Sequence, residues 1–398
     1  MGKINKQLIF ILYMLALITG LAPLSLAQAR VAPLQDLETE NLDESWPGLT
    51  WATASPEEMG MDPTRLAGAR EYALSAGGSG MITRNGVLVM SWGSTSQTYD
   101  LKSTGKSIGI TALGLAMKDG LMSLGDVASK YHPSLGTPPD ENLDTGWLEE
   151  ITIHHLATMT AGFDKSGGYT ELLFRPGTGW AYSDGGPNWL AEALTLTYRE
   201  DLYTLLNRRV FIPLGIPPDQ LFWRDNYYRP NTINGFANRE FGGISASVDA
   251  MARLGLLYLR DGRWVGGQQV ISADFVRATR AHYPQLVGLP EYEPLVYPHA
   301  SEHYGLLWWN NADGSLPHVP RDAYWAWGLY ESLIVVIPSL DIVATRASFR
   351  GWQDVDNLNP WTSDYRFIQP FIEPIALSAV LATPQQQHKL WIPLIDGG

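Results

Sequence analysis

Residues 101–107 read LKSTGKS and lead into the apolar run IGITALGLAM of residues 108–117, which is followed by Lys118-Asp119-Gly120. This pattern predicts a buried helix with Ser103 at its N-terminus. Ser103 and Lys106 are three positions apart, so both side chains lie on the same face of such a helix. A serine hydroxyl becomes a strong nucleophile when a neighbouring base removes its proton. The spacing therefore predicts a nucleophile and base pair.

A lysine acts as a base only in its neutral form. Burial and the positive end of the helix dipole both lower the pKa of Lys106, and N–H groups at the helix start can stabilise an oxyanion. In the alternative interpretation, Ser103 is a helix cap and Lys106 a solvated surface charge. The apolar helix and the scarcity of lysines weigh against that alternative without excluding it.

A second motif, RPGTGWAYSD, occupies residues 175–184 and precedes a predicted helix. Tyr182 is the natural third member of the set, because a phenol beside the serine can relay a proton to the leaving group. Alone, a tyrosine in a loop is usually a packing residue. The combination with Ser103 and Lys106 favours a proton relay.

Strand and helix signals on both sides of these motifs outline the fold. An Asn85-Gly86 turn joins two β-rich runs into a hairpin. Strands are expected at residues 81–83, 87–90, 304–309, 333–337 and 342–346. Helices are expected at residues 63–75, 103–118, 147–160, 186–198, 201–211, from 247 onward, and at 372–381. This order predicts an α/β (α+β) fold with an antiparallel sheet made from both chain ends and flanked by helices. A mostly helical lobe, roughly 101–230, is inserted, and the active site lies between the two.

The N-terminus has the features of an export signal. Two lysines precede an apolar run, and small residues follow it, so residues 1–29 are expected to be a signal peptide cleaved after Ala27 or Ala29. The alternative is an uncleaved membrane anchor, since the run approaches spanning length. We expect a secreted or periplasmic protein, with a linker or N-terminal arm at 30–53 and one hydrolase domain at 54–398.

Composition limits the partners and cofactors. The 398 residues include no cysteine, which excludes disulfides, thiolate metal ligands and a cysteine nucleophile. A formal net charge of −13 disfavours nucleic acid and anionic membranes. His154-His155 and the pair His299 and His303 lack a convincing helical ligand arrangement, so no metal and no cofactor are expected.

Several stretches together resemble the serine β-lactamase-like family, which includes class C β-lactamases, D-alanyl-D-alanine carboxypeptidases, esterases and 6-aminohexanoate-oligomer hydrolases. STGK at 103–106 matches the family's Ser-x-x-Lys motif, and YSD at 182–184 is similar to its Tyr-x-Asn. Connecting segments agree in order, namely LATMTAG at 156–162, PGT at 176–178, FIPLG at 211–215, GGISAS at 242–247 and YGLLWW at 304–309. The resemblance covers about Ser55 to Ala347. It implies a β-lactamase/transpeptidase-like fold with Ser103 as the acylated residue.

The third family motif departs from the pattern. Where many members carry Lys-Thr-Gly or His-x-Gly, this chain has Ala326-Trp327-Gly328, followed by Leu329. By resemblance to the esterase and 6-aminohexanoate-oligomer branch, the backbone N–H groups of Leu329 and Ser103 form the oxyanion hole. Ala326 removes the cation that holds a substrate carboxylate, unless an arginine such as Arg346 or Arg350 replaces it. Trp327 and Gly328 are expected to line the substrate pocket.

Asp184 stands where the family has asparagine. As a substrate-binding residue, its carboxylate would repel anionic substrates and accept a hydrogen bond from an amide or amine. The same charge favours protonated Lys106 and opposes the effects of burial and the helix dipole. The sequence leaves the outcome of that competition open.

Three functions are compatible with these residues. The first is an exported serine hydrolase that cleaves small-molecule esters, amides or peptides through an acyl-enzyme on Ser103. The second is a D-alanyl-D-alanine carboxypeptidase or weak β-lactamase. The third is an inactive, penicillin-binding-like binding protein, against which the complete set of Ser103, Lys106 and Tyr182 argues.

Overall fold

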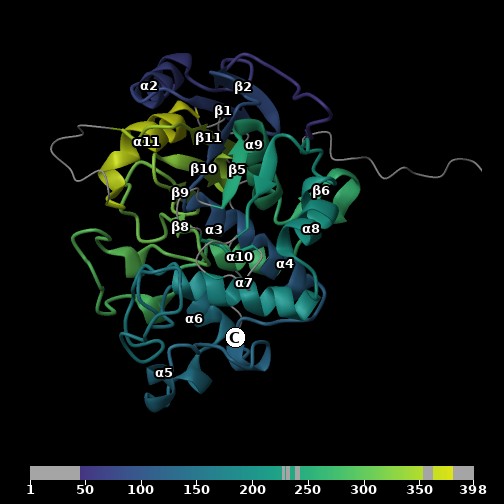
Figure 1. The fold of residues 1–398 in the computed structure, drawn as a ribbon. Coiled ribbons are helices and arrows are strands. Elements are labelled where there is room, and N and C mark those ends of the chain that lie inside the picture. Colours follow the sequence, from purple (N-terminus) through teal and green to yellow (C-terminus); the bar gives the residue numbers. More distant parts are fainter. Residues whose placement is uncertain (1–44, 226–228, 230–233, 238–242, 353–361, 380–398) are drawn as a thin grey trace, which may run out of the picture. The chain divides into compact units, whose positions relative to one another are not determined.

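The computed structural model describes residues 45–225, 229, 234–237, 243–352 and 362–379. Its centre is an antiparallel six-stranded sheet in the order β2-β1-β11-β10-β9-β8 (Figure 1). Strand β1 pairs with β11 in a continuous register from Ser79↔Ala347 to Arg84↔Ile342, so strands from the two chain ends lie side by side. The predicted sheet is confirmed. Its strands are β1 Ser79–Arg84, β2 Val87–Trp92, β8 Trp309–Asn310, β9 Tyr324–Gly328, β10 Ser332–Ile337 and β11 Ile342–Ala347.

Helices cover both faces of this sheet. Helix α9, Val248–Leu259, begins at the predicted cap, where Ser247 accepts a hydrogen bond from the N–H of Ala250. It packs so closely that a Cβ on Gly255 would lie 2.5 Å from Val343. Helices α2, Pro63–Leu74, and α11, Gln369–Ser378, pack together against the other face (Figure 1).

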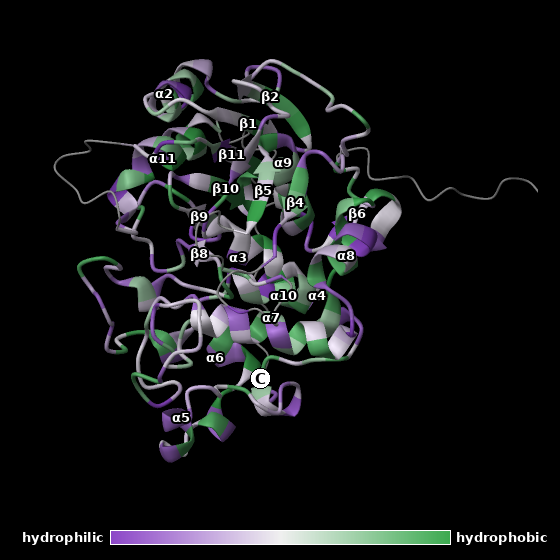
Figure 2. Ribbon diagram, in the orientation of Figure 1, coloured by the Kyte–Doolittle hydropathy of each residue, from purple (hydrophilic) through white to green (hydrophobic). Residues whose placement is uncertain are grey.

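The middle of the chain is mainly helical, as predicted, and carries a small sheet that the sequence did not predict. Its strands run in the order β3-β5-β4 and join segments far apart in the chain. The helices are α3 Thr104–Gly109, α4 Thr111–Lys118, α5 Glu141–Asp144, α6 Ile153–Ala157, α7 Gly185–Tyr198, α8 Leu202–Leu206 and α10 Ala273–Thr279, and the strands are β3 Thr98–Asp100, β4 Leu221–Trp223 and β5 Ile244–Ser247. Figure 2 shows apolar colour along α4, whereas α5 is mostly polar.

Three local predictions were wrong. The helix predicted at 147–160 is a short 3-10 turn, Leu148–Glu150, and the separate helix α6, because Ile151 and Thr152 between them have extended backbone. The single helix predicted at 103–118 is interrupted at Ile110, where Gly109 packs so tightly that a Cβ would lie 2.6 Å from Phe236. The strand predicted at 304–309 is a turn that leaves only its last residue in β8, because Leu307 adopts a left-handed φ of 55°. The Leu307 N–H donates to Ala157 O at 2.8 Å, so a tertiary contact overrides the local β-propensity.

The predicted signal peptide and residues 30–44 of the predicted arm lie outside the described residues. The rest of the arm is packed on the domain, since Trp51 is buried and its Nε1 donates to Asp249 at 2.5 Å. Thr53 forms a bridge with Leu88 of β2. Over the described ranges, no helix has the length and apolar character needed to cross a bilayer.

Candidate active site

Ser103 lies at a sharp turn between β3 and α3. The preceding residue, Lys102, has a left-handed φ of 53°, and its N–H donates to the Asp100 carboxylate at 3.2 Å. Ser103 is the N-cap residue of α3, yet its hydroxyl caps no N–H of that helix. The left-handed backbone of Lys102 is strained for a residue other than glycine, and such strain is concentrated at functional sites. The capping role considered for Ser103 does not occur.

Lys106 is 2% exposed and makes three polar contacts. Its Nζ lies 3.0 Å from Ser103 Oγ, 3.2 Å from Tyr182 OH and 2.6 Å from Asp184 Oδ1. A lysine ammonium has three N–H donors, one for each of these oxygens. Lys106 is therefore not a solvated surface charge, and the structure brings Ser103, Lys106 and Tyr182 together.

The structure also decides the charge of Lys106. Burial lowers the pKa of Lys106, but the charges and hydrogen bonds of Asp184 and Tyr182 together outweigh burial and raise this pKa above its usual value. Burial likewise raises the pKa of Asp184, whereas Lys106 and Lys165 together lower it to about 2. In the resting site Lys106 is therefore an ammonium and Asp184 a carboxylate.

Lys165 was not identified from the sequence. It lies in the loop between α6 and α7, with its Nζ 2.7 Å from Asp184 Oδ2 and 5.0 Å from the centroid of the Tyr182 ring. The loop is pinned to the Tyr182 segment by the Asp184 N–H, which donates to Lys165 O at 3.1 Å. No local pattern marks this lysine, because its partner is distant in sequence and is reached only through the folded loop.

Asp184 is not among the residues that line the cavity at Ser103. Its two carboxylate oxygens face Lys106 and Lys165. The repulsion of anionic substrates expected from Asp184 is therefore offset by two adjacent cations.

The end of β9 lies directly beside the start of α3. A Cβ on Gly328 would lie 2.2 Å from Leu101 O, so only glycine fits there without displacing one of the two segments. The Thr104 hydroxyl donates to Ser332 O at 2.5 Å and ties α3 to β10. Leu329 and Ser103 consequently border the same cavity. Ala326 is fully buried and does not line it.

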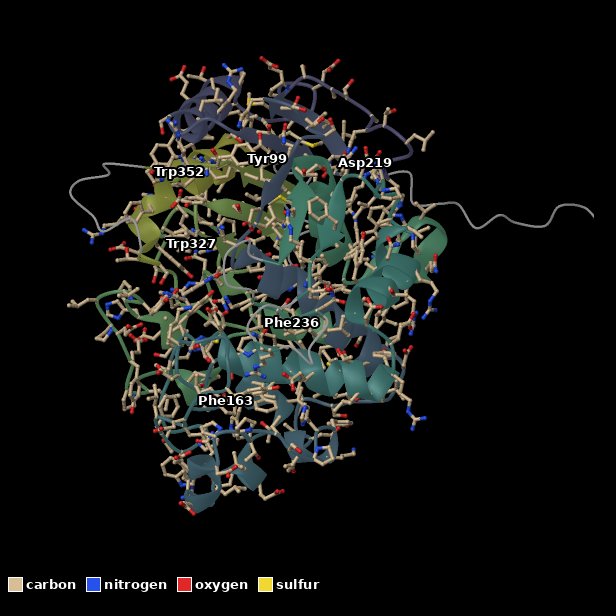
Figure 3. The ribbon with its side chains drawn as sticks, in the orientation of Figure 1. Tyr99, Phe163, Asp219, Phe236, Trp327 and Trp352 are labelled. Atoms are coloured by element: carbon tan, nitrogen blue, oxygen red, sulfur yellow. The ribbon has the colours of Figure 1, made fainter. Side chains whose placement is uncertain are left out.

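A buried arginine holds the turn that follows Leu329. Tyr330 and Glu331 have left-handed φ values of 67° and 48°. The Arg346 guanidinium donates to Tyr330 O and, at 3.1 Å, to Glu331 O. The Glu331 carboxylate accepts a hydrogen bond from the Trp352 N–H at 2.8 Å (Trp352 is labelled in Figure 3).

Neither arginine considered as a replacement cation lines the cavity. Arg346 is fully buried and binds the turn carbonyls. Burial raises the pKa of Glu331 to about 6, against the opposing effects of the Trp352 N–H and Arg346.

The cavity has a volume of about 220 Å³, and four aromatic side chains form one part of its wall. The Tyr182 ring stacks on Tyr297 with centroids 4.7 Å apart, and Trp309 continues the wall towards Trp327 (labelled in Figure 3). The residues lining it are Ser103, Lys165, Tyr182, Tyr297, Trp309, Trp327, Gly328, Leu329, Glu331, Thr362 and Ser363. The arrangement brings Ser103, Tyr182 and Leu329 to one cavity that can hold a molecule of modest size.

The histidines that the structure describes form no metal centre. Among the residues that the structure describes, no group of three or more histidine, aspartate or glutamate side chains is placed to hold a metal ion. His303 is buried, and its Nδ1 lies 3.2 Å from Asp313. His299 has a left-handed φ of 55° and is not in an α-helix.

Comparisons with known proteins agree with this fold. The sequence model of the family described as Beta-lactamase matches residues 70–351, more than half of the chain. The fold is similar to that of a putative beta-lactamase from Bacteroides dorei, with a TM-score of 0.61 and 14% identity over 80% of this chain and 99% of that one.

Two hydrolases have similar folds. EstCE1, described as a hydrolase with promiscuous acyltransferase activity, has a TM-score of 0.59 and 15% identity over 81% of this chain and 99% of its own. A putative 6-aminohexanoate-dimer hydrolase from Bacillus anthracis has a TM-score of 0.57 and 16% identity over 76% of this chain and 81% of its own.

Proposed function

Because this chain belongs to the beta-lactamase family, a family of hydrolases, we propose that it is a serine hydrolase that cleaves ester or amide bonds through an acyl-enzyme on Ser103. One observation carries the proposal. The buried Lys106 Nζ joins Ser103 Oγ and Tyr182 OH at 3.0 and 3.2 Å, and Ser103, Tyr182 and Leu329 line the same cavity. This arrangement supports the assignment of a nucleophile, a proton relay and oxyanion donors to one cavity.

The ammonium of Lys106 cannot accept a further proton. The reactive form is therefore the Lys106 and Tyr182 pair after it has lost one proton, which makes the pair a base for Ser103. Ser103 Oγ then attacks the carbonyl carbon, and its proton passes to this pair. The N–H groups of Ser103 and Leu329 donate hydrogen bonds to the carbonyl oxygen as it becomes an oxyanion.

Collapse of the tetrahedral intermediate breaks the bond to the leaving group. Tyr182 returns the proton to the departing oxygen or nitrogen, with Lys106 resupplying the phenol, and the acyl group stays on Ser103 Oγ. Water then enters the cavity, loses a proton to the same pair and releases the acyl group as a carboxylic acid. The pair passes the proton taken from water to Ser103 Oγ as the acyl bond breaks, so the cycle restores the singly deprotonated, reactive form of the pair.

The ester and amide assignment has two supports. Ala326 supplies no cation at the position where many relatives have one, and the aromatic side chains in the cavity wall can pack against an acyl group. EstCE1 and the 6-aminohexanoate-dimer hydrolase, both of similar fold, are named for hydrolysis. Export by residues 1–29 is part of the same proposal, and N-terminal sequencing of the exported protein would locate the cleavage site.

The test uses the Ser103→Ala variant and three reagents: a fluorophosphonate, a short-chain 4-nitrophenyl ester and nitrocefin. We expect the wild-type protein to hydrolyse the ester and to carry the phosphonate on the tryptic peptide that contains Ser103. Ser103→Ala should lose both, by roughly a thousandfold or more in kcat. Ser183→Ala is the matched control, because Ser183 Oγ is engaged with Asp164 O at 2.8 Å.

Three outcomes would contradict the proposal. An adduct on another serine would refute the assignment of Ser103. Hydrolysis of nitrocefin in clear preference to the ester would favour a β-lactamase or carboxypeptidase. Tight binding of nitrocefin without turnover or acylation would indicate an inactive binding protein.

A further inference from the structure

We propose that Lys165 is a specificity-determining residue that binds an anionic group, such as a carboxylate, on the substrate. This inference rests on the proposed function, because it concerns what the same cavity accepts. Among the described residues of the cavity wall, Lys165 is the one with a cationic side chain. It therefore supplies, from a different part of the fold, the charge that Ala326 lacks.

The ammonium of Lys165 is both held and accessible. Its Nζ contacts Asp184 Oδ2 at 2.7 Å, while 43% of its side chain remains exposed. An ammonium has three N–H donors, and within the described residues Asp184 is the one acceptor that Nζ contacts. Two donors are thus left for solvent or a ligand. Because Asp184 fixes the amine, less side-chain entropy is lost when an anion binds.

Asp184 does not cancel this positive charge. The same carboxylate is also bonded to Lys106 at 2.6 Å, and both lysines hold the pKa of Asp184 at about 2. In the resting site, the two ammonium groups and the one carboxylate together carry a net charge of one positive unit. A substrate anion meets Lys165 first, since Lys106 is 2% exposed.

Distance places Lys165 within reach of the reacting bond. Its Nζ lies 5.0 Å from the centroid of the Tyr182 ring, and Lys106 Nζ lies 4.9 Å from the same centroid. Lys165 and Ser103 line one cavity of about 220 Å³. A carboxylate a few bonds from the scissile carbonyl can therefore pair with Lys165 while the carbonyl contacts Ser103.

Glu331 also lines this cavity, but it does not neutralise Lys165. Its side chain is 5% exposed, and its carboxylate faces the Trp352 N–H and, at 3.9 Å, the Arg346 guanidinium. Its negative charge is thus directed to the turn at the end of β9 and is offset there by Arg346.

The experiment compares three chromogenic esters that differ in charge. One is neutral (4-nitrophenyl butyrate), one carries a carboxylate in its acyl group (mono-4-nitrophenyl glutarate), and one carries it in its leaving group (5-butyryloxy-2-nitrobenzoate). For each protein, kcat/KM of each anionic ester is divided by that of the neutral ester. This ratio cancels any general effect of a variant on Ser103 and Lys106.

We expect Lys165→Gln to lower this ratio about tenfold for at least one anionic ester, as the loss of a charged hydrogen bond predicts. Lys165→Glu should lower the ratio further and Lys165→Arg should retain it. The control is Lys130→Gln, because Lys130 is also paired with an aspartate, Asp126, at 3.6 Å, but does not line the cavity. Its ratios should equal those of the wild type.

The ester that responds identifies the side of the scissile bond on which Lys165 acts. Equal ratios in wild type and Lys165→Gln for both anionic esters would overturn the inference, even if the neutral ester is hydrolysed normally. Failure of the wild type to hydrolyse any of the three esters would instead refute the proposed function. The two failures are thus distinguishable.

Discussion

Lys106 is held in place by Asp184, in addition to its contacts with the Ser103 hydroxyl and the Tyr182 phenol. Asp184 Oδ1 lies 2.6 Å from Nζ and raises the pKa of Lys106 despite complete burial of the amine. In the resting enzyme the ion pair with Asp184 thus keeps Lys106, the expected base, in its protonated form. Catalysis then requires that one proton leave the Lys106 and Tyr182 pair, so activity should increase with pH.

The Asp184→Asn variant tests whether the Asp184 carboxylate keeps Lys106 protonated, because it removes that one negative charge. Removing the carboxylate removes the main influence that raises the pKa of Lys106, so burial lowers that pKa and the deprotonated pair forms at lower pH. We expect the alkaline rise in kcat to shift to lower pH, as measured by pH–rate profiles with a neutral ester. Asp126→Asn, at the surface pair with Lys130, should leave the profile unchanged. A shift to higher pH, or none, would contradict the charge assigned to Lys106.

At the scale of residues, the sequence predicted those members of the site that are close together in a motif or share a known motif order. Ser103 and Lys106 are related by helix geometry, and Tyr182 by its surrounding segment. Lys165 was not predicted as a site residue, because its position depends on a loop-to-loop contact with Asp184. The charge effect of Asp184 on substrates was misjudged for the same reason, since Lys165 offsets it.

The elements around the site are fixed by close contact between β9 and α3.

Strands rich in β-branched and aromatic residues, such as β10 and β11, were predictable from local pattern, as was the capped helix α9. The short strands β3, β4 and β5 were not, because three or four residues carry little periodicity. The turn at Leu307 was likewise hidden, since its conformation depends on Ala157 in a distant helix.

Gly328→Ala tests the contact between the two elements. The new Cβ would lie 2.2 Å from Leu101 O and 2.7 Å from Thr104 N, so β9 and α3 must separate. We expect kcat to fall by about a hundredfold, the cost typical of losing one oxyanion donor, together with a lower melting temperature. A folded variant with unchanged kcat would refute the placement of the oxyanion donors.

Gly68→Ala is the matched control, for which we expect a small increase in stability instead of a decrease. Gly68 lies within α2, and a Cβ there meets no atom within 4 Å. Alanine favours a helix over glycine by about 0.5–1 kcal/mol, so this variant should be slightly more stable and equally active.

Across the whole molecule, the sheet and the helical part form a single unit. The residues that the structure describes cluster as one compact body, and β1 joins β11 across nearly the full length of the domain. We expect thermal unfolding followed by tryptophan fluorescence and by far-UV circular dichroism to give coincident single transitions. Two separated transitions would show that the helical part unfolds independently.

Variants in each part sharpen this test. Leu190→Ala in α7 and Ile334→Ala in β10 remove fully buried side chains, and each should destabilise the one transition by about 2–5 kcal/mol. Leu196→Ala, at a position in α7 that is 49% exposed, should change it little. If Leu190→Ala affects one probe alone, the two parts are not coupled.

The pairing of β1 with β11 also dictates when the protein can fold. Strand β1 is synthesised early, but its partner Ile342–Ala347 leaves the ribosome only after the entire helical part has been made. Until then β1 has only β2 beside it, and a lone hairpin is at best marginally stable in water. The other edge of β1, with its unpaired N–H and C=O groups, stays open to any chain nearby. A nascent or truncated chain that ends before β11 is therefore the form of this protein most prone to aggregate.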